Sequence, residues 1–217
     1  TRRPVESFSF PVEKIKEGYY TDAYFMRSEE ILNGDNYHPR VLMQVFARDH
    51  VVVCGTDEVI ALIRQCAFHP ETIEIHSLRD GEEVDEWETV MTIEGDYADF
   101  AHLETIYLGI LARQSRIATN VRRVVKAANG KPVLFFPARY DIYQTQESDG
   151  YAALVGGIHG FSTDANALAA GGKGLGTIPH ALIASYKGDT VAATEAFDKY
   201  VDPSIARIAL VDFDNDC

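Results

Sequence analysis

Four charged or ionisable side chains in the second half of the sequence each follow an apolar run of strand length: Arg139, Asp164, His180 and Asp212. A guanidinium can hold a phosphate or carboxylate through two parallel hydrogen bonds. Asp212, or Asp214 two residues later, could bind Mg²⁺ or sugar hydroxyls through its carboxylate. An imidazole such as that of His180 can donate a proton, carry a positive charge or accept a phosphoryl group. The set predicts chemistry on an anionic, phosphorylated small substrate.

The elements that precede these residues predict that the four side chains meet. After Gly130, apolar runs of strand length alternate with helical segments; the runs are Pro132–Phe136, a short segment into Ser162, Leu175–Ile178 and Ile205–Val211. This alternation indicates parallel strands joined by right-handed crossovers. The carboxyl ends of parallel strands line the ligand crevice in such folds. We therefore expect the four side chains to lie on one rim.

The glycine-rich stretch Gly156–Tyr186 surrounds two of these residues and carries two histidines. Glycine lets the backbone approach a ligand closely, so the stretch favours a binding loop over a plain linker. Gly171–Gly174 does not match the nucleotide-binding P-loop, because no Ser or Thr follows Lys173. His159 is interpreted as a structural histidine.

The first half of the sequence predicts an α+β arrangement. Its predicted strands are Val41–Phe46, Val51–Cys54, Thr72–Leu78 and Glu88–Glu94. Its predicted helices lie within Val12–Leu32, over Thr56–Cys66 and, the longest, over Ala101–Ala128. The acidic segment around Asp80 is interpreted as a solvated face, and Arg113 and Arg116 as surface or salt-bridging arginines. We place a domain boundary near Gly130, giving an α+β domain over 1–130 and the first βα units of an α/β barrel over 131–217.

Composition excludes several classes of protein. Hydrophobic residues make up 46% of the 217 residues and the net charge is −13, which fits a globular enzyme and disfavours a nucleic-acid surface. No apolar run reaches membrane-spanning length and the N-terminus has no signal-peptide pattern, so we expect a cytoplasmic protein without a membrane partner. Cys54, Cys66 and Cys217 show no metal-binding spacing and are expected to be reduced.

Six stretches resemble nicotinate phosphoribosyltransferase, in the family that also contains the nicotinamide and quinolinate phosphoribosyltransferases. They occur in the family's order and span nearly the whole chain: Thr21–Tyr24, Glu104–Thr119, Phe136–Arg139, Ser162–Asn166, Gly176–His180 and Val211–Asp212. The resemblance implies a type II phosphoribosyltransferase fold, an α/β protein with an N-terminal α+β domain followed by an irregular barrel that is incomplete here. Phe-Pro-Ala-Arg departs from the commoner Phe-Gly-x-Arg, and the chain stops after the fourth predicted barrel strand, so we expect an N-terminal piece of a longer enzyme.

The resemblance also implies an activity. The enzyme would be a pentosyltransferase that transfers phosphoribosyl from phosphoribosyl pyrophosphate to nicotinate, forming nicotinate mononucleotide and pyrophosphate for NAD biosynthesis. ATP would be a coupled substrate, as in a nicotinate–nucleotide ligase, Mg²⁺ the cofactor, and a homodimer or higher homo-oligomer the assembly. The alternatives are a quinolinate or nicotinamide phosphoribosyltransferase, or a non-catalytic binding module.

Matched residue by residue, the resemblance implies the following site. Tyr24 would enter the partner subunit's site and stack on the pyridine, opposite Phe136. Arg139 would meet phosphate or pyrophosphate, with Thr163 and Asp164 also binding substrate and Thr177 near nicotinate. His180 would be the catalytic residue and the one phosphorylated by ATP. Asp212 would lie near ribose and Mg²⁺.

Overall fold

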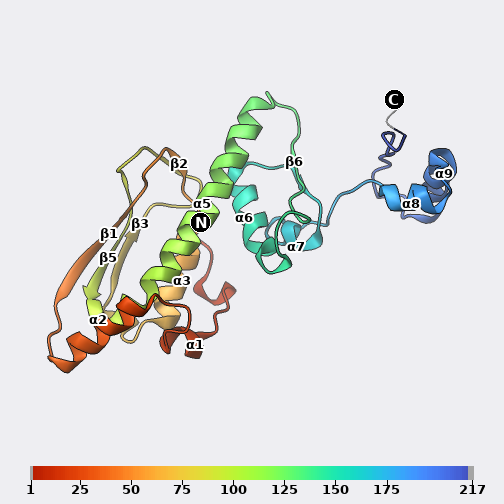
Figure 1. The fold of residues 1–217 in the computed structure, drawn as a ribbon. Helices are drawn as coiled ribbons and strands as arrows, with labels where there is room; N and C mark the ends of the chain where they lie inside the picture. The colour runs from red at the N-terminus through yellow and green to blue at the C-terminus, as the bar shows by residue number, and fades with distance from the viewer. Residues whose placement is uncertain (1, 215–217) are drawn as a thin grey trace.

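The structure is a computed structural model, and it describes residues 2–214. Figure 1 shows an antiparallel sheet with helices, a long central helix, short βα units, and a pair of helices near the C-terminus. The helices are α1 (Val12–Lys16), α2 (Ala23–Gly34), α3 (Thr56–Cys66), α4 (Tyr97–Phe100), α5 (Glu104–Ala127), α6 (Gln146–Gly156), α7 (Asp164–Ala167), α8 (His180–Ser185) and α9 (Thr190–Tyr200). The strands are β1 (Arg40–Phe46), β2 (Val51–Val52), β3 (Glu74–Ser77), β4 (Glu83–Val84), β5 (Thr89–Asp96), β6 (Leu134–Phe135) and β7 (Gly160–Phe161). Within residues 2–214, no helix combines the length and apolar character needed to cross a membrane.

Strand β5 is the centre of a three-stranded antiparallel sheet in the order β1-β5-β3. Strand β1 pairs with it from Arg40 opposite Asp96 to Phe46 opposite Thr89. Exposed and less exposed residues alternate along β1, and β5 is more deeply buried, because one face of the sheet packs on helices. The strands expected over 41–46, 72–78 and 88–94 are confirmed.

The main hydrophobic core lies between this sheet and helices α3 and α5. The period of the apolar residues in α3 places Val59, Leu62 and Ile63 on one buried face, against Ile93 of β5 and Tyr107 of α5. Cys54 and Cys66 are both buried, free thiols, and burial raises the pKa of each. Cys217 lies outside the described residues.

Helix α5 belongs to two cores. Its N-terminal half packs in the core just described through Tyr107 and Leu111, whereas Val121 packs with Ala153 of α6 and Phe161 of β7 in a second cluster. The predicted domain boundary near Gly130 lies just after α5, and α5 contributes side chains to the hydrophobic clusters on both sides of that boundary.

The second cluster is built on a βαβ unit. Strands β6 and β7 are parallel, with Leu134 opposite Gly160 and Phe135 opposite Phe161, and α6 connects them. Parallel pairing of strands joined by a helix is the pattern that the alternation after Gly130 predicts.

Two further strands expected from apolar runs are absent from the described part of the chain. Residues 172–179 form an extended connection in which Leu175 donates one backbone hydrogen bond to Phe161 at 2.6 Å, without strand pairing. Residues 205–212 have no regular secondary structure, and Ile205, Ile208 and Val211 are exposed. A strand requires a series of hydrogen bonds to a neighbouring strand, and the single bond from Leu175 to Phe161 of β7 does not make one. The run 205–211 pairs with no strand of residues 2–214.

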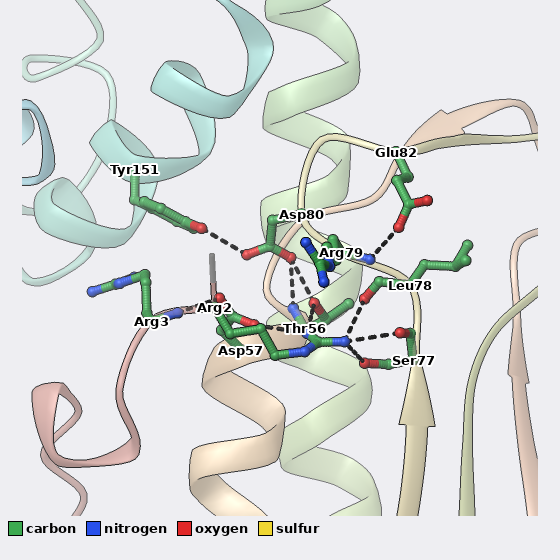
Figure 2. Close-up of polar contacts among 10 residues, drawn as sticks. All are labelled: Arg2, Arg3, Thr56, Asp57, Ser77, Leu78, Arg79, Asp80, Glu82 and Tyr151. Atoms are coloured by element: carbon green, nitrogen blue, oxygen red, sulfur yellow. Dashed lines mark hydrogen bonds and ion pairs between the residues drawn. The ribbon is translucent and has the colours of Figure 1, made fainter.

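Asp80 joins elements from both halves of the chain (Figure 2). Its Oδ1 accepts hydrogen bonds from the backbone N–H and the hydroxyl of Thr56, both at 2.9 Å, at the start of α3. Its Oδ2 accepts from the hydroxyl of Tyr151 in α6 at 2.8 Å. Beside it, Arg2 donates to Asp57 Oδ1 at 2.7 Å. The interpretation of the acidic segment as a solvated face is wrong for Asp80, because tertiary contacts engage both of its oxygens.

We expect Tyr151→Phe to lower the free energy of unfolding by about 1 kcal/mol, because it removes a hydrogen bond to a carboxylate and keeps the ring. The ring packs under the guanidinium of Arg3, whose carbon lies 4.4 Å from the ring centroid. Urea unfolding measures the difference. The control is Tyr37→Phe, at an exposed tyrosine with no side-chain hydrogen bond to any described residue. Equal stabilities of the two variants would contradict a contribution from the Tyr151–Asp80 bond.

Candidate functional site

His180 and Asp212 lie side by side in the structure. Nε2 of His180 lies 3.2 Å from Oδ1 of Asp212, and the two side chains are 58% and 59% exposed. Phe213 stacks on the imidazole, with the ring centroids 6.2 Å apart and an angle of 29° between the planes. An accessible imidazole held by a carboxylate on one nitrogen can exchange protons or accept a transferred group through the other.

Helices α8 and α9 support this pair through their own small core. Ile178, Ile183 and Ala193 are buried, and Leu210 and Phe213 pack against them from the segment that carries Asp212. His180 begins α8 directly after Pro179, which is the N-cap residue. The sequence motif thus places the histidine at a helix start, and the return of the chain after α9 supplies the carboxylate.

A second group of predicted residues lies at the carboxyl ends of β6 and β7. Phe136 follows β6 and is 51% exposed, and Arg139 lies in a turn that the hydrogen bond from Tyr140 N–H to Pro137 O closes at 2.8 Å. Arg139 is exposed and forms no ion pair with any residue in the range 2–214. Its guanidinium is therefore free to bind an anion.

Thr163 and Asp164 follow the neighbouring strand β7. The hydroxyl of Thr163 caps α7 by accepting a hydrogen bond from Asn166 N–H at 3.1 Å. Asp164 accepts a hydrogen bond from Gly174 N–H at 2.7 Å and lies 3.6 Å from Nζ of Lys173. The Gly174 hydrogen bond, aided by the Lys173 charge, holds the pKa of Asp164 below its usual value. Both side chains therefore shape the glycine-rich loop.

The remaining predicted residues lie apart from these groups. Thr177 is exposed in the connection before α8, and its hydroxyl donates to Ile178 O at 3.0 Å. Tyr24 lies in the first turn of α2, 58% exposed, and its hydroxyl is 3.3 Å from Oδ2 of Asp22. Partial desolvation and the Asp22 carboxylate raise the pKa of Tyr24.

The structure thus forms two groups where the sequence predicts one rim. Phe136, Arg139, Thr163 and Asp164 share the ends of the parallel pair β6-β7, whereas His180 and Asp212 belong to the α8-α9 unit. Figure 1 shows that unit set apart at the end of an extended connection. The physical reason is that the runs 175–178 and 205–211, which would carry His180 and Asp212 to the same rim, do not pair as strands in the described structure.

Arg113, which the sequence predicts to be a surface or salt-bridging arginine, positions the loop that follows β6 through two carboxylates. Its guanidinium lies 2.9 Å and 2.8 Å from the two oxygens of the buried Asp149, and 2.6 Å from Oδ2 of Asp141. The hydrogen bond from Arg113 holds the pKa of Asp141 below its usual value. The salt-bridging role is confirmed, and its consequence is that the loop carrying Arg139 is tied to α5.

The candidate metal ligand is a single carboxylate. Among the residues that the structure describes, no group of three or more His, Cys, Asp or Glu side chains could hold a metal ion. Asp212 offers one exposed carboxylate, which would fit a Mg²⁺ ion whose other ligands are substrate oxygens and water.

His159 forms two hydrogen bonds with Val133. Its backbone N–H donates to Val133 O at 3.0 Å, and its Nδ1 accepts from Val133 N–H at 3.2 Å, as its structural interpretation predicts.

The chain is similar to known phosphoribosyltransferases in sequence. Residues 22–115 match the family model for the N-terminal domain of quinolinate phosphoribosyl transferase. The nicotinate phosphoribosyltransferase pncB1 of Mycobacterium tuberculosis is 27% identical to the chain over 86% of the chain and 49% of its own length. The chain spans about half the length of the relatives it matches.

Solved structures of a phosphoribosyltransferase and a pyrophosphorylase share the fold of this chain. The nicotinate-nucleotide pyrophosphorylase of Pyrococcus furiosus is 36% identical and has a TM-score of 0.85, over 94% of this chain and 53% of that one. The human nicotinic acid phosphoribosyltransferase, at 16% identity, shares the fold alone with a TM-score of 0.67, over 89% of this chain and 45% of that one. The α/β fold class, with an N-terminal domain of the quinolinate phosphoribosyltransferase type, is confirmed. The chain therefore belongs to the type II phosphoribosyltransferase family.

Proposed function

We propose that the protein transfers phosphoribosyl from phosphoribosyl pyrophosphate to nicotinate in NAD biosynthesis, forming nicotinate mononucleotide and pyrophosphate. The observation that carries phosphoribosyl transfer to a pyridine is the 36% identity to a nicotinate-nucleotide pyrophosphorylase, a phosphoribosyltransferase of the quinolinate type, over 94% of this chain. The choice of nicotinate as the pyridine rests on the similarity to a nicotinate phosphoribosyltransferase over 86% of the chain.

The accessible side chains suit the proposed roles. The transition state of ribosyl transfer carries positive charge on the ribose and negative charge on the departing pyrophosphate, so orientation and charge stabilisation do most of the work. Arg139, without a carboxylate partner in the described structure, would hold phosphate oxygens. Phe136 offers an exposed aromatic face for the pyridine ring, and the exposed Tyr24 would offer another from a partner subunit.

Asp212 would bind Mg²⁺, and His180 would react with ATP. Mg²⁺ would neutralise charge on the pyrophosphate, and Asp212 would hold it through one carboxylate. His180 would accept a phosphoryl group from ATP at the ring nitrogen that does not face Asp212. The added negative charge would repel the pyrophosphate product and so promote its release.

Quinolinate is the second candidate substrate, because the family model matched over residues 22–115 bears its name. Quinolinate carries one more carboxylate than nicotinate and calls for another cation. At the ends of β6 and β7, Arg139 is free of carboxylates within the described structure, whereas Lys173 lies 3.6 Å from Asp164. This charge count favours nicotinate.

An assay of mononucleotide formation tests the proposal. The full-length protein is incubated with phosphoribosyl pyrophosphate and Mg²⁺, with nicotinate, nicotinamide or quinolinate, and with or without ATP. We expect product from nicotinate and stimulation by ATP. Product from quinolinate alone would replace the first candidate with the second, and no product from any of the three would overturn both.

We expect His180→Ala to abolish the stimulation by ATP, since no other group in the proposal accepts the phosphoryl. His76→Ala is the matched control, at an exposed histidine of β3 outside the predicted site. Undiminished stimulation in His180→Ala would refute the phosphohistidine role while leaving the transfer reaction itself in place.

A further inference from the structure

A cleft of ≈ 620 Å³ lies between the β1–β2 connection and the exposed face of α5. Three arginines line it: Arg48 from the connection, and Arg116 and Arg123 from α5. None of the predicted site residues lines this cleft, so it is a feature separate from the strand ends and from the α8-α9 unit.

The three arginines have no acidic partner among residues 2–214. Every arginine that forms an ion pair within residues 2–214 lies within 3.0 Å of a carboxylate; these are Arg2, Arg40, Arg113, Arg122 and Arg207. Asp49 is the one acidic residue in the lining, and the imidazole of His50 is already held 2.9 Å from Asp85. In a chain of net charge −13, a cluster of unpaired cations in a cleft indicates a site for an anion.

The spacing of the arginines defines the shape of that anion. Arg116 and Arg123 are seven residues apart on α5, which corresponds to about 10 Å along the helix axis. A single phosphate or carboxylate group cannot offer a separate anionic group to each of the three guanidinium groups. An elongated anion, with several charged groups along its length, would contact both and Arg48 as well.

Part of the lining of the cleft is apolar, and we call this part the floor. It consists of Val45, Val90, Leu108 and Leu111, and Asn120 adds an amide that has no hydrogen-bond partner among the described residues. Apolar side chains beside convergent polar groups are typical of sites for small organic molecules. We propose that the cleft binds an elongated organic phosphate, whose phosphate groups pair with Arg116, Arg123 and Arg48 and whose apolar part rests on this floor.

Trp87 provides a built-in reporter of binding. It is the single tryptophan of the sequence, and its ring centroid lies 5.3 Å from that of Phe46, which lines the cleft. A ligand that orders the β1–β2 connection changes the surroundings of the indole, and so its fluorescence.

The experiment is a titration of the protein with inorganic tripolyphosphate, followed by calorimetry and by Trp87 fluorescence, at low ionic strength and without Mg²⁺. We expect saturable binding about tenfold or more tighter than that of inorganic phosphate, because the longer ion offers a separate phosphate group to each of the three arginines. Citrate, which carries carboxylates instead of phosphates, is expected to bind more weakly than tripolyphosphate.

The double variant Arg116→Gln/Arg123→Gln should weaken tripolyphosphate binding about tenfold or more, because it removes two of the three charged contacts. The control Arg27→Gln/Arg79→Gln removes the same charge at two exposed arginines that also lack ion pairs within the described chain. Equal weakening in both double variants would show a net-charge effect only and overturn the site. Absence of saturable binding, equal binding of inorganic phosphate, or equal binding of citrate would also overturn the proposal.

Discussion

Gly150→Ala is expected to lower the free energy of unfolding by about 3 kcal/mol, because an added methyl group has no space between α6 and α7. A Cβ at Gly150 would lie 2.1 Å from the backbone O of Asn166 and 2.6 Å from its carbonyl carbon. These are backbone atoms and cannot rotate away as a flexible side chain would. Asn166 is fully buried, and its side chain donates to Gln146 O at 2.7 Å, which fixes it further.

Gly109→Ala is the matched control for this substitution. Gly109 lies on the exposed face of α5, and nothing lies within 4 Å of the position of an added Cβ. Alanine should stabilise the helix there by about 0.5–1 kcal/mol, because glycine loses more backbone entropy on folding. Urea unfolding of the two variants should therefore give effects of opposite sign. A Gly150→Ala protein as stable as the parent would show that α6 and α7 do not pack as closely as described.

Arg113→Met is expected to lower the free energy of unfolding by about 3 kcal/mol, because it leaves the carboxylate of Asp149 buried without its cation. Asp149 is 2% exposed, and both of its oxygens accept hydrogen bonds from Arg113. The hydroxyl of Thr145, at 2.9 Å from Asp149 Oδ2, is a neutral donor and cannot replace the charge.

The double variant Arg113→Met/Asp149→Leu should recover most of this loss, since it removes the buried charge together with its partner. Arg40→Met serves as the control, because Arg40 also pairs with two carboxylates, Glu74 and Glu94, each at 2.8 Å, but on the surface. Water screens that cluster, so the loss there should stay below about 1 kcal/mol. If Arg113→Met were no worse than Arg40→Met in urea unfolding, the burial of Asp149 would carry no penalty.

Local periodicity explains which elements the sequence predicted. The three- and four-residue spacing of apolar residues in Thr56–Cys66 matches α3 over the same residues, and the long stripe after Ala101 matches α5 over Glu104–Ala127. The alternating run Val41–Phe46 matches β1. In each case the element buries one face, and the spacing of apolar residues follows directly from that burial.

Apolar runs near the C-terminus show where this reasoning fails. Ile205–Val211 has the composition of a buried strand, yet several of its apolar side chains are exposed in the structure. Composition gives the tendency to be extended, whereas pairing depends on a neighbouring strand with free backbone groups. The same reason separates the predicted single rim into the β6-β7 ends and the α8-α9 unit.

The sequence by itself determined the family resemblance, the α/β class and the residue types of the candidate site, because motif order and apolar spacing are properties of the chain alone. Only the tertiary structure decided which charges are paired. It placed His180 against Asp212, 32 positions later, buried Asp149 against Arg113, and left Arg116 and Arg123 without carboxylates in the described part of the chain. A charge is stabilised or left free by neighbours that are distant in sequence, so its role follows from the packing of α5, α6 and the C-terminal helices.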